Sequence, residues 1–221
     1  MVLSHGHLDH TWGLVPLVAL LLETALNARP VTRPVLVSHP MAFQSRSVPG
    51  IPEIGSIVDV DRLARQFHLA LHAEPHWVTR DLVFLGEIPR VHDFEAAPPL
   101  GTRHTPNGDV PDSIPDDSGM ACVTDKGLVV ITGCAHSGVC NMVTHAQVVT
   151  GVQRVRAIIG GMHLLEAPRE RLEKTAAFLR PLELEALYPC HCTDLAAKIA
   201  LARHLPVTEV GVGLRLEFGA A

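Results

Sequence analysis

Apolar residues along the chain form short runs that alternate with longer stretches of helical periodicity. Runs of four or five apolar residues bounded by Gly, Pro or a turn predict buried strands. Stretches in which apolar residues recur every three or four positions predict helices. Strands that alternate with helices are typical of an α/β layered domain. The predicted strands are 35–38, 82–85, 121–124, 128–132, 157–161 and 184–188, and the predicted helices are 14–28, 140–150, 169–179 and 195–204.

The segment 96–117 separates these elements and is rich in Pro, Gly and Asp. We expect it to form a long surface loop, and loops of this length inside a compact domain are often functional. The chain has 221 residues, of which 47% are hydrophobic, so it is long enough to bury its own core. The simplest interpretation is one domain, residues 1–221, with a loop insertion at about 96–117.

Composition excludes several classes of function. The net charge is −5 and no run of Lys or Arg stands out, so we expect no nucleic-acid partner. The longest apolar stretch, 12–22, is about half of a membrane span and contains Pro16, so we expect no membrane segment. No secretory signal precedes it. The five cysteines are an odd number and do not suggest a disulfide framework, which favours a reduced, cytoplasmic protein.

Histidine is the unusual residue, with 14 copies against one Tyr and two Trp. The chain begins MVLSHGHLDH, in which His5 and His7 are two residues apart. On an extended segment such residues point to the same side, so both imidazoles can reach one ion. Asp9 and His10 follow as the chain turns, point elsewhere and can serve a second ion. Imidazole and carboxylate groups in this spacing are typical metal ligands.

Three later histidines share one position relative to the predicted strands. Each follows a buried strand within four residues, and ligands in α/β sheets converge at the carboxyl ends of the strands. One such histidine alone is ordinary, but three beside the opening motif predict a metal site. They are His136 after 128–132, His163 after 157–161 and His191 after 184–188.

At this point the sequence resembles a known family. H-x-H-x-D-H with later strand-end histidines is similar to the metallo-β-lactamase fold, a four-layer αββα scaffold with one or two metal ions. Four longer stretches resemble a subgroup of metallohydrolases that includes the archaeal synthase of 7,8-dihydropterin-6-methyl-4-(β-D-ribofuranosyl)aminobenzene 5'-phosphate. These stretches are FLGEIPRVHDFE (84–95), DDSGMACVTDKGLVVITGCAHSGVCN (116–141), IIGGMHL (158–164) and YPCHCT (188–193).

The resemblance implies a ligand set and a cofactor. It makes His5, His7 and His136 the ligands of one divalent ion, and Asp9, His10 and His191 the ligands of another. In the general fold an aspartate after a later strand bridges both ions, but the stretch IIGGMHLLE has none. His163 is placed to act there, with Glu166 as the weaker alternative. The implied cofactor is two divalent ions, Zn²⁺ first, with Mn²⁺, Fe²⁺ or Mg²⁺ as alternatives, and the implied catalytic residues are Asp9 and His163.

The missing bridging carboxylate has an electrostatic consequence. Two divalent ions with one carboxylate and one hydroxide keep about two positive charges. Such a site favours a small anionic substrate, a phosphate or diphosphate ester, over a neutral lactam. Arg90 and Glu87 lie in a matching stretch and are the candidate substrate-binding residues, although Arg90 equally suits a surface salt bridge.

Three groups near these motifs have structural interpretations. Asp116 and Asp117 lead into the predicted hairpin and suit the cap of a turn. Cys190 and Cys192 flank His191 and, on an extended segment, point away from it, so we expect small buried residues, with thiolate ligation as the alternative. Asp194 precedes the helix 195–204 and is a typical N-cap.

Several functions remain open at this stage. A hydrolase would use water activated by the ions, whereas a synthase would join a dihydropterin diphosphate to an arylamine with the same ligands. A lactonase or β-lactamase-like hydrolase is an alternative. A further alternative is a non-catalytic or degenerate metal-binding chain, because the resemblance implies about 50 residues of strands before the motif. The chain therefore looks N-terminally truncated, and we expect a homodimer that covers the exposed N-terminal sheet.

Overall fold

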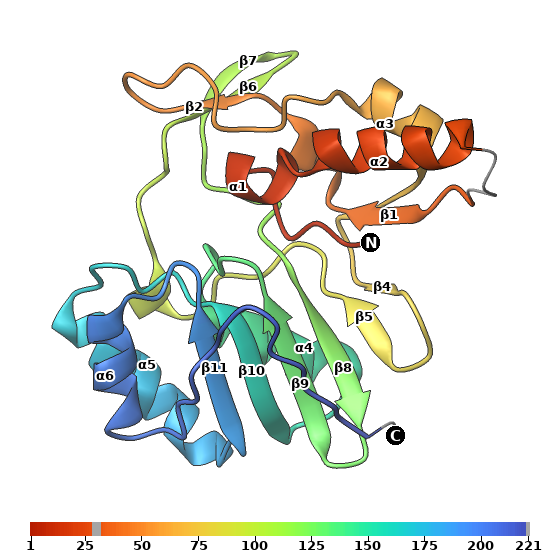
Figure 1. Ribbon diagram of the computed structural model, residues 1–221. Helices are drawn as coiled ribbons and strands as arrows, with labels where there is room; N and C mark the ends of the chain where they lie inside the picture. The colour runs from red at the N-terminus through yellow and green to blue at the C-terminus, as the bar shows by residue number, and fades with distance from the viewer. Residues whose placement is uncertain (28–31, 220–221) are drawn as a thin grey trace. The chain divides into compact units, whose positions relative to one another are not determined.

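The computed structural model describes residues 1–27 and 32–219, and the chain divides into two compact units (Figure 1). Unit 1 consists of Met1–Ala73 and Pro98–Asp116, and unit 2 of Glu74–Ala97 and Asp117–Ala221. Each unit has its own β-structure and its own hydrophobic core.

Unit 2 is built on a six-stranded mixed sheet with the order β11-β10-β9-β8-β5-β4. Strands β9, β10 and β11 are neighbours and run parallel, so their carboxyl ends lie at the same edge. Strands β8 and β9 form the hairpin that the sequence predicts, with Lys126 in its turn. The bounds are β4 (His76–Trp77), β5 (Leu82–Phe84), β8 (Gly119–Thr124), β9 (Gly127–Thr132), β10 (Val155–Gly161) and β11 (Ala186–Cys190).

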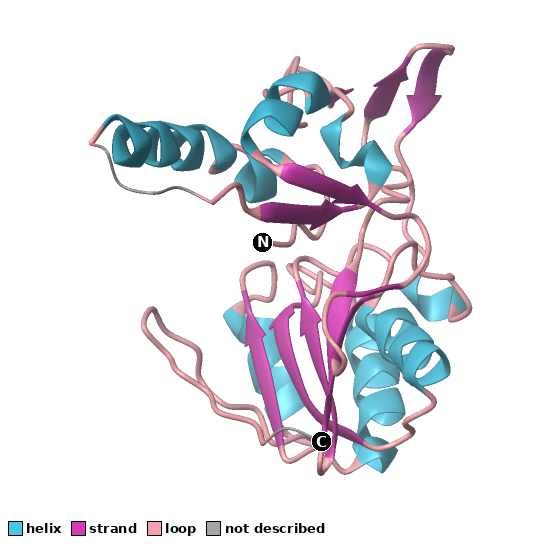
Figure 2. Cartoon of the chain, turned by 90° about the vertical axis from the view of Figure 1, so that its right-hand side faces the viewer, coloured by secondary structure: helices cyan, strands magenta, loops and turns pink. Residues whose placement is uncertain are grey.

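Helices α4 (Val139–Thr150), α5 (Arg169–Leu179) and α6 (Leu195–Ala202) pack with this sheet around one core (Figure 2). Each helix contributes buried side chains to that core, among them Met142 of α4, Leu179 of α5 and Leu201 of α6. The core packing explains why the helices form here, because a helix of this length is marginal without a buried apolar face. Short 3₁₀ segments η2 (Asp93–Glu95) and η3 (Arg180–Leu182) flank the helices.

Side-chain carboxylates satisfy the backbone amides at the starts of two of these helices. The carboxylate of Glu95 accepts hydrogen bonds from the amides of Cys140 and Asn141 in the first turn of α4, at 2.9 and 2.8 Å. Asp194 accepts from the amide of Ala197 at 2.7 Å, which confirms it as the N-cap of α6. The first backbone amides of a helix have no acceptor within the helix, and both carboxylates provide one.

The described residues of unit 1, which leave out 28–31, form two small sheets and three α-helices. Strands β1 (Val35–Ser38) and β3 (His68–Leu71) pair in parallel, and the chain start pairs with β1 through a bridge between Val2 and Val37. The remaining elements are α1 (Leu8–Thr11), α2 (Leu14–Leu26), η1 (Pro40–Phe43), β2 (Arg46–Ser47) and α3 (Val60–Gln66). Leu14, Leu36, Leu63 and Phe67 form the centre of its core.

The segment 96–117 is not the loop that its composition predicts. It contains a hairpin of β6 (Thr102–Thr105) and β7 (Gly108–Pro111), and β6 also pairs with β2. His104 fastens this hairpin, because its ring nitrogens lie 2.9 Å from Ser47 Oγ and 2.8 Å from Asp109 Oδ1. The hairpin is half-buried to exposed, so its sequence lacks the apolar alternation by which a strand is predicted.

The predicted strands and long helices are otherwise present, with ends that shift by at most two residues. Helix α5 has the predicted bounds, whereas helix α2 ends at Leu26 and the predicted terminal residue Ala28 lies outside the described residues. Missed elements include α1, α3 and the two-residue strands β2 and β4, which are too short for a periodic signal. Among the helices of residues 1–27 and 32–219, none is both long and apolar enough to cross a membrane.

Two helix ends of unit 2 provide a test of backbone conformation. Gly151 ends α4 with φ 72°, in open space, and exposed Glu183 ends η3 with φ 50°. Because an L side chain is strained in this region, we expect Gly151→Ala to lower the free energy of unfolding by about 1 kcal/mol. Glu183→Gly should raise it by about 0.5–1 kcal/mol. Urea unfolding measures both changes.

Gly13→Ala is the matched control, because Gly13 has φ −62° and nothing within 4 Å of an added Cβ. There the alanine should leave stability unchanged or raise it slightly. Equal losses for Gly13→Ala and Gly151→Ala would show that φ is not the cause.

Candidate metal centre

In unit 1 the predicted ligands lie on one loop and the short helix that follows it. The loop leaves the segment paired with β1, and His7 stands at the N-terminal end of α1. His5 Nε2 lies 3.0 Å from His7 Nδ1, so the two rings point to the same side as their spacing predicts. His5 is fully buried and His7 is 7% exposed. Two imidazoles are thus held together in a water-poor position.

Asp9 and His10 belong to α1 and face each other, with Asp9 Oδ2 3.3 Å from His10 Nε2. The ring of His10 also lies beside that of His5, with centroids 4.2 Å apart. Ser4 Oγ contacts Nδ1 of both rings, at 3.1 Å for His5 and 3.2 Å for His10. All four predicted ligands of unit 1 therefore gather in one cluster.

The electrostatic surroundings of His7 favour the neutral ring. Burial lowers the pKa of His7, and the positive charge of Arg46 lowers it further, while Asp116, Asp112 and Asp9 act in the opposite direction. A neutral imidazole is the form that binds metal ions. The surroundings thus keep His7 in a ligand-competent form.

In unit 2 the other predicted ligands follow β9, β10 and β11 at the shared edge of the sheet. The rings of His136 and His163 lie beside each other, with centroids 4.3 Å apart. His191 Nε2 lies 3.1 Å from the sulfur of Cys134. The structure therefore brings together His136, His163 and His191 at neighbouring strand ends, as their positions in the sequence predict.

Each of these three strand ends contains a non-glycine residue with positive φ: Ala135 at 56°, His163 at 50° and His191 at 53°. Such conformations are uncommon outside glycine and cost about 1–3 kcal/mol each. They turn the chain sharply where it leaves the sheet. Strained residues that cluster in this way are characteristic of functional sites.

The conformation of His191 corrects the expectation for the cysteines. We expected Cys192 to point away from the site, an argument that holds only for an extended segment. With φ 53° at His191 the chain is not extended there. Cys192 Sγ instead accepts the amide of His163 at 3.2 Å and lies 3.3 Å from the carbonyl oxygen of Cys134.

Hydrogen bonds from Cys134 and His163 outweigh the effect of burial and lower the pKa of Cys192 to about 4. The sequence pattern left thiolate ligation by Cys192 as the alternative only, because it gave no sign of the turn at His191. Gly161 permits the arrangement, because a Cβ there would lie 2.4 Å from the carbonyl oxygen of Gly133 and 2.8 Å from Cys192 Sγ.

The remaining candidates lie at less defined positions. Glu87 and Arg90 are exposed on the segment after β5. Glu166 has φ 52°, and its amide donates to Asp194 at 2.8 Å, so it belongs to a turn beside α6. His39 follows β1, is buried, and accepts the Met41 amide through Nδ1, which makes it a cap of η1 that the sequence did not suggest.

The donor types at these positions fit a transition metal. They are imidazole nitrogen, thiol sulfur and one carboxylate, the ligands that Zn²⁺ commonly takes. His163 Nδ1 is buried and has no hydrogen-bond partner among the described residues. A buried polar atom of this kind usually has a partner, so an ion is a chemically sensible one.

Comparisons with known proteins show similarity to two archaeal sequences. No family model matches the chain. It is 30% identical over 209 residues to the 7,8-dihydropterin-6-methyl-4-(β-D-ribofuranosyl)-aminobenzene-5'-phosphate synthase of Methanocaldococcus jannaschii, and the match covers 90% of this chain and 67% of the synthase. An uncharacterized protein of the same organism is 26% identical over 204 residues, covering 92% of this chain and 72% of that protein.

A solved structure defines the fold. The crystal structure of a metal-dependent hydrolase of the β-lactamase superfamily matches with a TM-score of 0.80 and 24% identity, over 99% of this chain and 78% of that one. The fold is therefore the mixed α/β fold of that superfamily. With the sequence match, the chain has this fold and belongs to the family of the 7,8-dihydropterin-6-methyl-4-(β-D-ribofuranosyl)-aminobenzene-5'-phosphate synthase.

Proposed function

We propose that the chain is a metal-dependent enzyme with two divalent ions, in which His5, His7 and His136 hold one ion and Asp9, His10 and His191 hold the other. His163 takes the place of the bridging carboxylate of the general fold. The observation that carries this proposal is the convergence of imidazoles within each unit, above all the 3.0 Å separation of His5 Nε2 and His7 Nδ1. Family membership supports the pairing of the two ligand groups.

Bound ions would act as Lewis acids that polarise a phosphoryl or carbonyl oxygen and stabilise negative charge. The residues of the chain hold and orient them. Ser4 Oγ fixes the ring orientation of His5 and His10, which is the usual role of a hydrogen-bonding neighbour of a ligand. Asp9 is the only carboxylate in the predicted set, so the ions would keep a net positive charge.

That charge supports an anionic substrate, and we propose a phosphate or diphosphate ester. The relative is named as the synthase of a dihydropterin-linked aminobenzene phosphate. The reaction we propose first for this chain is therefore the condensation of a dihydropterin diphosphate with an arylamine. Arg90, which is exposed, would contact the phosphate, and Glu87 would lie on the same side of the substrate. Hydrolysis of a phosphodiester is the second candidate, because the fold neighbour is named as a hydrolase.

Metal content tests the ligand set. We expect about two equivalents of divalent metal per chain of wild-type protein, with Zn²⁺ bound most tightly. His136→Ala and His191→Ala should each lose about one equivalent, because each removes a ligand from a different ion. Elemental analysis of the purified proteins measures this.

His104→Ala is the control, because His104 is bonded to Ser47 and Asp109 on the hairpin and lies outside the predicted set. It should retain the wild-type metal content. A wild-type chain without metal would contradict the enzyme proposal and favour a degenerate member of the family.

Substrate charge tests the proposed reaction. Product analysis with a dihydropterin diphosphate plus the arylamine, with p-nitrophenyl phosphodiesters and with neutral lactones should show turnover of the phosphorus compounds. Arg90→Ala should raise KM for the productive compound by about 10-fold, because a charge-assisted contact is lost. Arg80→Ala removes an exposed arginine of the same unit that pairs with Asp81, and should leave KM unchanged. Preferred turnover of lactones would contradict the proposal.

A further inference from the structure

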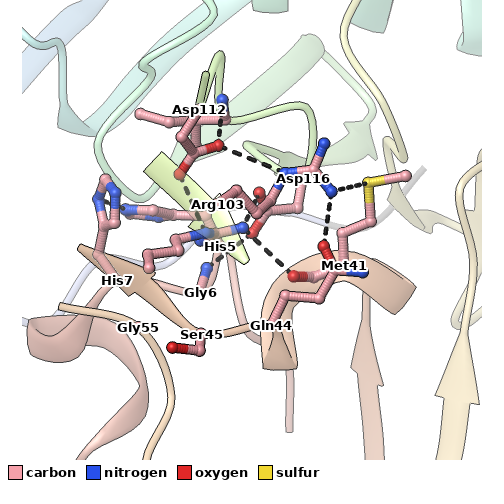
Figure 3. Close-up of polar contacts among 12 residues, drawn as sticks. His5, Gly6, His7, Met41, Gln44, Ser45, Gly55, Arg103, Asp112 and Asp116 are labelled. Atoms are coloured by element: carbon pink, nitrogen blue, oxygen red, sulfur yellow. Dashed lines mark hydrogen bonds and ion pairs between the residues drawn. The ribbon is translucent and has the colours of Figure 1, made fainter. Parts of the chain in front are cut away.

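The loop that carries His5 and His7 is held by a buried carboxylate. The amide of Gly6, between the two histidines, donates to Asp116 Oδ2 at 2.8 Å (Figure 3). Gly6 is also tightly enclosed, because a Cβ there would lie 2.3 Å from the carbonyl oxygen of Ala42 and 2.5 Å from Arg46 Nη1. This one hydrogen bond therefore acts on the residue whose backbone sets the direction of both rings.

Asp116 is itself fixed by a buried charge. Its other oxygen, Oδ1, accepts from Arg46 Nη2 at 2.5 Å, and both side chains have no exposed surface. Arg46 also pairs with the equally buried Asp112, through Nε and Oδ2 at 3.1 Å. A buried charge is costly unless it is paired, so neither carboxylate can move away from the guanidinium without a large loss.

The next residue, Asp117, makes the corresponding contact in unit 2. Its Oδ2 accepts from the amide and the hydroxyl of Ser137, at 2.8 and 2.5 Å, and Ser137 directly follows His136. Asn141 donates to the carbonyl oxygen of Ser137 at 2.8 Å, which fixes the same turn from α4. Asp116 is the last residue of its segment of unit 1, and Asp117 opens the following segment of unit 2.

We propose that Asp116 and Asp117 are positioning residues of the metal centre, Asp116 for the loop of His5 and His7 and Asp117 for the loop of His136. This proposal rests on the proposed function, since it takes these histidines as ligands. The sequence suggested only the cap of a turn for both residues. Their burial, 0% and 1% exposed, and their contacts with the ligand loops replace that interpretation.

Asp112 offers a closely matched control for Asp116. Each carboxylate is fully buried, pairs with Arg46 through one oxygen and accepts a backbone amide with the other, that of Gly6 for Asp116 and that of Ile114 for Asp112. The amide-accepting oxygen of Asp112 also lies 3.6 Å from Arg103 Nε. Asn at either position has a single acceptor oxygen and must give up one of the two contacts. Only at position 116 is one of the two contacts made with the loop that carries His5 and His7.

The experiment compares the Zn²⁺ affinity of full-length wild-type, Asp116→Asn and Asp112→Asn proteins by competition with a chromophoric chelator, and their urea midpoints without metal. We expect both variants to lose stability to a similar extent. Asp116→Asn should also lose about 10–100-fold in Zn²⁺ affinity, the usual effect of removing a group that orients a ligand, whereas Asp112→Asn should stay close to wild type. An unchanged affinity in Asp116→Asn, or equal affinity losses in both variants, would overturn the role of Asp116.

Asp117→Ala repeats the test on the other loop and keeps it informative if Asp116→Asn does not fold. Its control is Glu95→Ala, which also removes a buried carboxylate bound to backbone amides near the start of α4, but not next to His136. Asp117→Ala should weaken Zn²⁺ binding by about 10–100-fold and Glu95→Ala should not. A wild-type chain that binds no Zn²⁺ would overturn both this proposal and the proposed function, whereas tight wild-type binding that these variants leave intact would overturn this proposal alone.

Discussion

The buried guanidinium of Arg46 is the constraint on which unit 1 depends. A positive charge with no exposed surface must be compensated within the protein, and Asp112 and Asp116 supply the two carboxylates. Both lie after the hairpin β6–β7, some 70 residues along the chain from Arg46, so the requirement for neutrality fastens that segment to β2 and η1. The same contact then leaves one oxygen of Asp116 for Gly6. The contacts that compensate the buried charge of Arg46 thus also hold the loop that carries His5 and His7.

In unit 2 the parallel strands of the sheet, and not a buried ion pair, position the loops that carry the predicted ligands. Because β9, β10 and β11 run parallel, the loops that follow all three strands begin at the same edge of the sheet. Small residues allow these loops to approach, as the close contact at Gly161 shows. The three residues with positive φ then redirect the chain before it can run past the edge. Because packing in the core holds the strands, it can sustain this local strain, and the loops need no regular structure of their own.

The sequence predicts most of the helices and strands, because these follow from the local periodicity of apolar residues. It predicts few of the contacts between charged residues that are distant in the chain. Helix α5 and the strand ends that carry His163 and His191 follow from local pattern, because core packing imposes the period of each element. The orientation of Cys192 does not follow, since it depends on one dihedral angle at His191 that side-chain type does not reveal. The pairing of Arg46 with Asp116 is equally hidden, because nothing in either segment marks a partner 70 residues away.

The charges of the candidate centre also bear on what it can accept. As far as His136, His163 and Cys192, the segments that leave β9, β10 and β11 contain imidazole and thiol groups, and the carboxylates that follow are Glu166 and Asp194, of which Asp194 caps α6. The nearby carboxylates of Asp117 and Glu95 accept hydrogen bonds from backbone amides. Asp116 is likewise committed to Arg46 and Gly6. The acidic residues around the predicted ligands therefore act on the scaffold, and few are left to neutralise divalent ions. Divalent ions held by these ligands would keep a positive charge, and that charge is the physical basis of the proposal of a phosphate-bearing substrate.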